Sequence, residues 1–301
     1  MSEWVPDRVV SPADAAALIG AQFPDLRGAP VEPLATGWDN TVHVVGGQWV
    51  FRFPRRAVAV PGVAREIAVL PRLAGRLPLP VPVPELVGQP TETYPWPFWG
   101  ARRIPGVELA DSRLPDDGRT AAAIGVGRFL RALHDPGLVG LAGDDPVHDP
   151  MRRGDPAVRA GKARAVLDSV AARGVGVPDV AALLARAERA DPPAGPAVLS
   201  HGDLHVRHVL VDGAGQAAGV IDWGDLCLAD PAVDLSLAYA AFSGPAREAL
   251  LAAYGIVPPE RELAARVLAV SLCASLADYA ADDDRPVLLR EALAGLARAA
   301  A

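Results

Sequence analysis

The sequence predicts an α+β fold with two lobes, a small first lobe built on an antiparallel sheet and a larger, mainly helical second lobe. Short strand-like runs separated by turns follow one another in the first third of the chain. From Thr120 onward, apolar residues recur mostly at the spacing of helices. A strand that runs into a turn over about 99–106 separates the two patterns, and we place a hinge there. The expected domains are therefore 1–103 and 104–301.

The first lobe is expected to begin with a helix and to continue with a hairpin. A helix can start at Ser11-Pro12-Ala13-Asp14, because serine caps, proline fits the first turn and an acid favours a helix N-terminus. It should run to about Phe23. The Gly46-Gly47 turn joins the strand-like runs 41–45 and 48–53. Arg52 lies in the second run among Val and aromatic residues, so it either points to solvent or faces a site that holds an anion.

A helix with one apolar stripe is predicted at 63–73. Glu66 lies beside that stripe, and a glutamate that faces the interior needs a partner, for which Arg52 is the candidate. The proline-rich stretch 77–84 cannot be helical and predicts an extended connection to another strand.

Helical patterns dominate the second lobe. An amphipathic helix is expected at 120–134, followed by a loop at 135–155 that is rich in Gly, Asp and Pro. Six further helices, several with proline near the start, are expected at about 157–173, 178–190, 231–242, 245–254, 259–281 and 286–300.

One polar stretch, 198–234, interrupts these helices and holds three of the six histidines. Two short apolar runs separated by a Gly-rich turn predict a β-hairpin over 209–221, with Asp203 just before it and Asp222 at its far end. A hairpin brings its two ends together, so Asp203, His208 and Asp222 should converge. Converging carboxylates repel unless a cation shares them, which predicts a divalent metal site beside a catalytic acid/base.

Composition excludes several classes of protein. A net charge of −7 argues against a nucleic-acid binder, and is compatible with a cationic small ligand or with a solvated acidic surface. Two cysteines do not make a disulfide framework and favour a reducing compartment. The start of the chain lacks a secretion signal pattern, and no apolar run is long enough to span a membrane. We expect a cytoplasmic protein, monomeric or weakly dimeric, with a small-molecule partner.

Three motifs in this order carry a family resemblance. The chain contains His201-Gly202-Asp203-Leu204-His205 with His208-Val209-Leu210-Val211-Asp212, then Ile221-Asp222-Trp223-Gly224-Asp225, then Asp230-Pro231 with Asp234-Leu235. This pattern resembles the aminoglycoside phosphotransferase family of antibiotic kinases, which shares the protein-kinase-like fold. Within that family the chain is most similar to macrolide 2′-phosphotransferases. The resemblance covers nearly the whole chain and implies a nucleotide-binding first lobe and a catalytic, acceptor-binding second lobe.

The resemblance implies roles for residues of the second lobe. Asp203 would orient the acceptor hydroxyl and take its proton late, and Asp222 with His208 would hold Mg²⁺ against the nucleotide phosphates. The catalytic loop would be braced by His201 and Asp234. A lower-ranked set of acids near the acceptor consists of Asp225, Asp278 and Asp282, although the last two could also be a helix end meeting a loop.

It also implies roles for the first lobe. Arg52, held by Glu66, would contact the phosphates of ATP or GTP, and the loop at Thr36 and Gly37 would position the nucleotide. The backbone around Arg102 and Ile104 would contact the purine edge. The sequence departs from the family at two positions, since Arg52 replaces the usual Lys and His208 the usual Asn.

Four functions stay open at this point. The first is a nucleotide-dependent O-phosphotransferase acting on a macrolide or aminoglycoside and thereby conferring resistance. The second is a kinase of an ordinary metabolite alcohol, such as an amino sugar or a choline-like or homoserine-like compound, since fold does not fix substrate. The third is a non-catalytic nucleotide-binding regulator. The fourth is a metal-dependent hydrolase built on His201, Asp203, His205 and His208.

Overall fold

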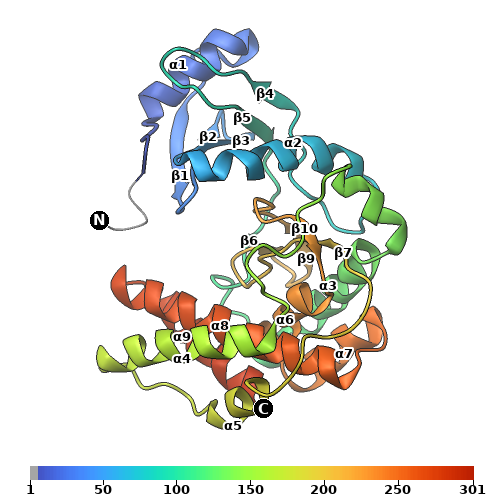
Figure 1. Cartoon of the computed structure of the whole chain (residues 1–301). Coiled ribbons are helices and arrows are strands. Elements are labelled where there is room, and N and C mark those ends of the chain that lie inside the picture. Colours follow the sequence, from blue (N-terminus) through green and yellow to red (C-terminus); the bar gives the residue numbers. More distant parts are fainter. Residues whose placement is uncertain (1–5) are drawn as a thin grey trace. The chain divides into compact units, whose positions relative to one another are not determined.

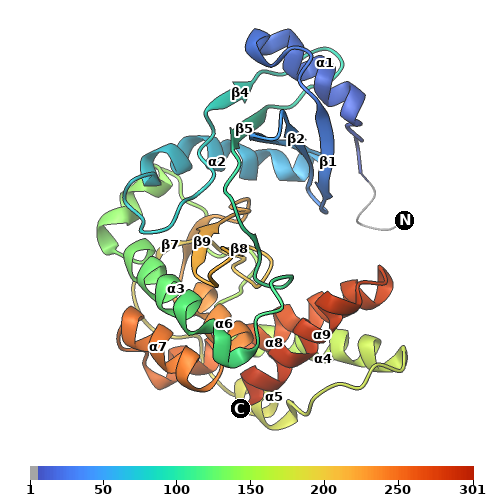
Figure 2. The ribbon, with the colours of Figure 1, turned by 180° about the vertical axis from the view of Figure 1, so that it is seen from behind.

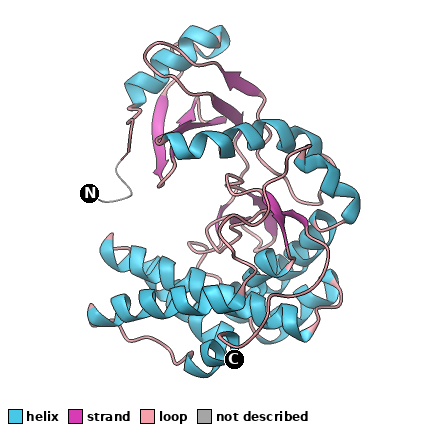
Figure 3. Cartoon of the chain, viewed as in Figure 1, coloured by secondary structure: helices cyan, strands magenta, loops and turns pink. Residues whose placement is uncertain are grey.

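The computed structural model describes residues 6–301 and divides the chain into two compact units. Unit 1 comprises residues up to 76 together with 80–104, and unit 2 comprises 77–79 and 105–301. Figure 3 shows the contrast in content, with an antiparallel sheet in unit 1 and mostly helices in unit 2. This confirms the predicted α+β fold class.

Unit 1 is built on a five-stranded antiparallel sheet of order β1-β2-β3-β5-β4 (Figure 1). The strands are β1 (Val31–Thr36), β2 (Asn40–Val45), β3 (Trp49–Pro54), β4 (Leu86–Gly88) and β5 (Phe98–Arg102). Its helices are α1 (Pro12–Gln22) and α2 (Val60–Leu73), with short 3₁₀ turns at Pro24–Leu26 and Ala57–Ala59.

Local sequence signals explain these elements. Ser11 caps α1 and Asp14 returns the bond to the Ser11 backbone N–H, so both halves of a capping box are present. Gly46 and Gly47 both have positive φ, 58° and 69°, which is the backbone of a tight hairpin turn. The structure confirms the β2–β3 hairpin, and helix α2 begins three residues before the expected start, with Pro61 in its first turn.

The two faces of the sheet differ because side chains alternate along β3. Phe51 and Phe53 join Phe98 and the α1 residues Ala15 and Ile19 in one apolar cluster. Trp99 and Ala101 of β5 pack instead with Val63 of α2. Since Arg52 lies between Phe51 and Phe53, it points to the α2 face rather than into the aromatic cluster.

Unit 2 is an assembly of helices around α8 (Pro259–Asp282). Helix α8 packs against α4, α6 and α9, and α3 packs against α7 (Figures 1 and 2). The remaining helices are α3 (Thr120–Leu133), α4 (Pro156–Ala172), α5 (Ala181–Ala187), α6 (Ala232–Ala241), α7 (Gly244–Tyr254) and α9 (Pro286–Ala300). The predicted loop at 135–155 includes a 3₁₀ segment, Pro136–Ala142, and a second one, Asp116–Arg119, precedes α3.

Helix α8 is also long and apolar enough to span a membrane by length and composition. However, 72% of its most apolar window is buried inside the structure. Its composition is therefore that of a core helix.

Short strands of unit 2 carry the polar stretch of the sequence. Strands β8 (Val209–Val211) and β9 (Ala217–Val220) form the predicted hairpin, and β6 (Val107–Glu108) extends it on the β8 side. A separate pair joins β7 (Val198–Ser200) to β10 (Cys227–Ala229). The three strands β6, β7 and β10 are too short to show a period, which is why the sequence did not predict them.

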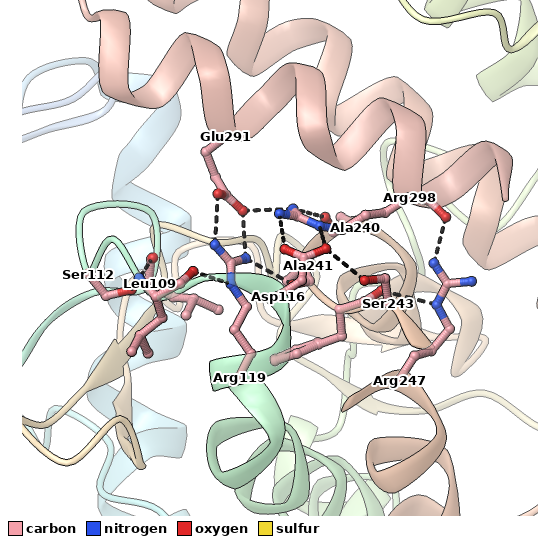
Figure 4. A network of polar contacts seen from close by, with 12 residues as sticks. Leu109, Ser112, Asp116, Arg119, Ala240, Ala241, Ser243, Arg247, Glu291 and Arg298 are labelled. Atoms are coloured by element: carbon pink, nitrogen blue, oxygen red, sulfur yellow. Dashed lines mark hydrogen bonds and ion pairs between the residues drawn. The ribbon is translucent and has the colours of Figure 1, made fainter. Parts of the chain in front are cut away.

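A polar network connects α9 to the C-terminal end of α6 and to the segment before α3 (Figure 4). Glu291 lies between two guanidinium groups, accepting from Arg119 at 2.7 and 2.8 Å and from Arg298 at 2.8 Å. Arg298 also binds Asp116 at 2.7 and 3.0 Å. The same two arginines donate to main-chain carbonyls at the C-terminal end of α6, those of Ala240 and Ala241. We call Asp116, Arg119, Glu291 and Arg298 the helix-corner network.

Candidate active site

Arg52 and Glu66 form a buried ion pair in unit 1. Arg52 Nη1 lies 3.3 Å from Glu66 Oε1, and Trp99 Nε1–H donates to Glu66 Oε2 at 3.2 Å. The Arg52 guanidinium lies 5.7 Å from the centre of the Trp99 ring, within the range of a cation–π contact. The expected pairing of Arg52 with Glu66 is thus confirmed, and of the two orientations left open for Arg52 the structure excludes the one toward solvent.

The other unit 1 candidates lie at strand ends. Thr36 ends β1, and the Gly37 N–H donates to the Asn40 carbonyl at 2.9 Å, closing a tight turn into β2. Arg102 ends β5 with its guanidinium 3.9 Å from the centre of the Trp49 ring. Its side chain therefore lies against Trp49 of the neighbouring strand β3. Ile104, two residues further on, is half-buried.

In unit 2, Asp234 fixes the start of the loop that follows β7 and carries Asp203. Its two oxygens accept from the backbone N–H groups of His201 (2.8 Å) and Gly202 (3.0 Å). His134 Nε2 lies 3.2 Å from the same carboxylate. Burial alone would raise the pKa of Asp234, but these hydrogen bonds and the neighbouring histidines lower it, so the group is held as a carboxylate. The bracing contacts implied for Asp234 are present, and His134 is a partner that the sequence did not reveal.

Gly202 and His201 then set the path of the loop. Gly202 has φ +89°, and a Cβ there would lie 2.2 Å from the Asp225 carbonyl oxygen, so only glycine fits. His201 Nδ1 accepts from the Asp203 N–H at 3.3 Å, and Nε2–H donates to the Ile221 carbonyl at 2.9 Å. Both ring nitrogens are used, and burial lowers the pKa of His201, so the ring is a neutral brace.

The hairpin brings together Asp203, His208 and Asp222, as predicted. The Ile221 N–H donates to the His208 carbonyl at 2.9 Å, which places the residue after Ile221 beside His208. His208 Nδ1 lies 2.8 Å from the Asp203 carbonyl oxygen and must donate to it, since a carbonyl only accepts. The other nitrogen, Nε2, faces Asp222 Oδ2 at 3.5 Å. A lone pair on that nitrogen would oppose a carboxylate oxygen unless a cation or a proton lies between them.

Asp222 has an unusual backbone. Its φ is +65°, a left-handed conformation that costs energy for any residue with a Cβ. Such strain is often kept at functional sites, and here it lies two residues after the end of β9. Trp223, fully buried, donates its Nε1–H to the Val220 carbonyl at 3.1 Å and packs against the His201 ring, which holds this corner in place.

Arg153 is a member of the site that the sequence did not indicate. Its Nη2 lies 3.0 Å from Asp203 Oδ1, and its Nη1 lies 3.2 Å from Asp225 Oδ1. The adjacent Arg152 pairs with Asp155 at the surface. Nothing in the local pattern distinguishes two neighbouring arginines in a loop, so only the fold shows which one reaches Asp203.

The remaining acids of the acceptor set lie on α8, and both contact Arg173. Asp278 Oδ1 lies 3.2 Å from Arg173 Nη2 and accepts from Ser169 Oγ at 3.1 Å. Asp282 Oδ1 lies 3.5 Å from Arg173 Nη1. Both carboxylates therefore have a cationic partner within the protein.

A cluster of Asp203, His205 and His208 offers ligand atoms within 4.8 Å of one another, a spacing that could suit a transition metal. The hydrogen bonds oppose this use. His205 Nδ1 accepts from the Arg207 N–H at 3.3 Å, so the proton of the neutral ring is on Nε2, the nitrogen that faces Asp203. Burial keeps the pKa of His205 well below its ordinary value. A second pair of candidate ligand atoms is Asp222 Oδ2 with His208 Nε2, 3.5 Å apart.

Comparison with known proteins assigns the chain to a class. Residues 30–265 match the phosphotransferase enzyme family, and the chain belongs to it. A short segment of 39 residues is 49% identical to the uncharacterized protein YcbJ of Bacillus subtilis (strain 168), covering 13% of each chain.

Solved structures of the same architecture include kinases of two antibiotic classes. The GDP complex of wild-type aminoglycoside 2′-phosphotransferase-IIIa superposes with a TM-score of 0.67 at 21% identity, covering 96% of this chain and 98% of that one. The macrolide 2′-phosphotransferase MphH from Brachybacterium faecium gives 0.59 at 24% identity, covering 95% and 97%. Macrolide 2′-phosphotransferase type I gives 0.54 at 25%, covering 96% and 98%. The protein-kinase-like fold implied by the resemblance is thus confirmed.

Proposed function

We propose that the protein is an ATP- or GTP-dependent O-phosphotransferase that moves the nucleotide γ-phosphate to a hydroxyl of a macrolide antibiotic. The observation that carries the proposal is the convergence of Asp203, His208 and Asp222 on a loop braced by Asp234. Phosphoryl transfer requires positioning and charge neutralisation more than covalent help; this arrangement offers a positioned carboxylate, Asp203, and candidate ligands for a cation that would neutralise the phosphates.

In the proposed reaction, Asp203 orients the acceptor hydroxyl and receives its proton late, as the oxygen–phosphorus bond forms. Asp222 and His208 would hold Mg²⁺, which neutralises charge on the phosphates. The donors suit the ion in part, since Mg²⁺ prefers oxygen and His208 offers nitrogen. The 3.5 Å separation of His208 Nε2 from Asp222 Oδ2 supports a cation at that position.

The nucleotide-binding role of unit 1 is assigned to Arg52, whose pairing with Glu66 and contact with Trp99 hold its guanidinium in one place. A fixed guanidinium is suited to phosphate oxygens, because its planar donors match their geometry. The turn at Thr36 and Gly37 and the backbone from Arg102 to Ile104 are proposed to contact the rest of the nucleotide. Relatives bound to GDP, and one bound to ATP and streptomycin, support a purine nucleotide without favouring one base.

The ion pairs of the candidate acceptor-binding acids favour one class of acceptor. A polycationic aminoglycoside needs carboxylates that are available to its amines, but Asp225 is held by Arg153 and Asp278 by Arg173. Each amine would have to displace an arginine that already pairs with the carboxylate. A macrolide presents far less positive charge and does not require this exchange, so we propose it ahead of an aminoglycoside.

The hydrolase alternative is disfavoured by the same hydrogen bonds. His201 uses both ring nitrogens, and His205 directs a proton toward Asp203. A multi-histidine metal centre would need those nitrogens as ligands.

The test is a transfer assay on purified protein with Mg²⁺ and either ATP or GTP. The acceptor panel contains macrolides, aminoglycosides and small amino alcohols, and mass spectrometry reports the addition of one phosphoryl group to each. We expect transfer to macrolides. Transfer only to aminoglycosides would contradict the acceptor argument, transfer only to amino alcohols would favour a metabolite kinase, and nucleotide binding without any transfer would favour a non-catalytic regulator.

A further inference from the structure

We propose that Arg153 is a positioning residue, which holds Asp203 Oδ1 so that the second carboxylate oxygen, Oδ2, is presented to the acceptor hydroxyl. This inference rests on the proposed function. It also assigns Asp225 to holding Arg153 in place rather than to binding the acceptor.

The geometry of the guanidinium carries the proposal. One terminal nitrogen of Arg153 contacts Asp203 and the other contacts Asp225, at 3.0 and 3.2 Å, while only 13% of its side chain is exposed. The planar fork therefore spans two carboxylates with separate donors, which a lysine ammonium cannot do with the same geometry.

The loop that carries Arg153 is itself fixed. The Asp149 carboxylate accepts from the Arg153 N–H at 2.7 Å and from the Gly154 N–H at 2.8 Å. Asp149 is tied in turn to β10, because its N–H donates to the Leu228 carbonyl at 3.0 Å. The Arg159 side chain, from α4, donates to the Arg152 carbonyl at 3.3 Å. The Arg153 side chain thus starts from a backbone that is anchored at both ends.

The two oxygens of Asp203 are not equivalent. Oδ1 is taken by Arg153, whereas Oδ2 makes no hydrogen bond to any residue of the described range 6–301, and its contact with His205 Nε2 is 3.8 Å long. The backbone of Asp203 is held on both sides, by His201 at its N–H and by His208 at its carbonyl. With the backbone of Asp203 and its Oδ1 fixed, Oδ2 points in a defined direction. The rate of phosphoryl transfer depends steeply on that direction, since displacement of a reacting group by about 1 Å can lower a rate about 100-fold.

The kinetic test uses Arg153→Gln, Arg153→Lys and Asp225→Asn, with Arg164→Gln as the matched control. Arg164 lies on α4 of the same unit and pairs with Glu188 at the surface. We expect Arg153→Gln to lower kcat about 30- to 100-fold while the KM for nucleotide changes by less than about threefold, because the reacting group and not the nucleotide site is displaced. Arg153→Lys should recover part of the loss, Asp225→Asn should lose less than Arg153→Gln, and Arg164→Gln should match the wild type. A folded Arg153→Gln enzyme with kcat within about twofold of wild type would overturn the proposal.

A crystal structure of Arg153→Gln provides a second measurement that needs no acceptor. The Asp203 carboxylate should rotate or become disordered, and a carboxylate that stays within about 0.5 Å of its wild-type position would contradict the positioning role. The kinetic and crystallographic measurements together distinguish a failure of the proposed function from a failure of the role proposed for Arg153. If the wild type transfers phosphate to no acceptor, the proposed function fails, and the position of Asp203 in the variant still decides whether Arg153 orients it.

Discussion

In unit 2, Arg153 bridges the carboxylates of Asp203 and Asp225, whereas Arg119 and Arg298 share Glu291 in the helix-corner network. The residue types are the same, but the partners are not. In the helix-corner network the guanidinium groups also donate to the carbonyls of Leu114, Ala240 and Ala241. The ion pairs of Arg153 are instead with the side chains of Asp203 and Asp225.

Exposure separates Glu291 from Asp203, although Asp116 of the helix-corner network is 42% exposed, about as much as Asp225. The side chain of Glu291 is 11% exposed, and both its oxygens accept from arginines. Asp203 and Asp225 are 22% and 43% exposed, and Oδ2 of Asp203 has no hydrogen bond to the part of the chain that the structure describes. In the helix-corner network, the arginines donate to main-chain carbonyls as well as to carboxylates, and these hydrogen bonds stabilise the junction of the helices. A network that leaves one carboxylate oxygen unused can instead accept a proton from a ligand.

The largest expected effect distinguishes the two regions by chemistry. Asp203→Asn removes the carboxylate that would receive the proton of the substrate hydroxyl. It should lower kcat by about 10³-fold or more, with nucleotide affinity within about threefold of wild type. The comparison is made by single-turnover transfer and by nucleotide titration. An Asp203→Asn enzyme that keeps a tenth of wild-type turnover would remove this residue from the catalytic role.

The second prediction tests the opposite region by stability. Glu291→Gln leaves the buried Arg119 without a carboxylate partner and leaves Arg298 with Asp116 alone, and it should lower the free energy of unfolding by about 3 kcal/mol. Urea unfolding measures the change. The matched control is Glu248→Gln, an exposed glutamate on α7, which should stay within about 0.5 kcal/mol of wild type. Equal stabilities of the two variants would show that the helix-corner network contributes little.

The third prediction asks whether the contact between His208 and Asp222 is shared by a cation. His208→Ala should weaken Mg²⁺-dependent nucleotide binding about tenfold, because one of the two ligands is lost. His208→Asn supplies an oxygen ligand and should bind Mg²⁺ at least as well as the wild type. Calorimetric titration of Mg²⁺ at saturating nucleotide measures both, and an unchanged affinity in His208→Ala would mean that His208 contacts no metal.

Much of the fold could be predicted because the signals were local. Helix α1 follows from the capping box at Ser11, and the β2–β3 hairpin follows from Gly46-Gly47. The β8–β9 hairpin placed His208 beside Asp222, since hairpin pairing has a fixed register. Alternation along β3 likewise determined that Arg52 meets Glu66.

The missed features depend on contacts between distant segments. Arg153 reaches Asp203 from a loop with no periodic pattern, and His134 reaches Asp234 from the end of α3. Neither residue type is unusual where it stands in the sequence. The helix-corner network was missed for the same reason, because Arg119 and Glu291 come from opposite ends of unit 2. These charged residues meet partners that are far away in the sequence. The spacing of residues within one segment does not show which distant segment will pack against it.

The smallest expected effect sharpens the comparison through pH. The hydrogen bond from Arg298, with help from Ser243 and against partial burial, lowers the pKa of Asp116 from its ordinary 3.8 to about 2. Between about pH 4 and pH 2 the unfolded chain therefore binds more protons at this residue than the folded one, so the stabilisation is complete above that window and is lost as the pH falls through it.

Asp116→Asn should abolish this contribution, so that its urea midpoint falls less steeply than that of the wild type over the same window. Asp117→Asn, at the exposed neighbouring acid, is the matched control and should follow the wild type. Identical pH profiles for the two variants would mean that Asp116 is not coupled to Arg298 in solution. The helix-corner network would then depend on Glu291 alone, and its resemblance to the Arg153 cluster, in which one cation is shared by two acids, would disappear.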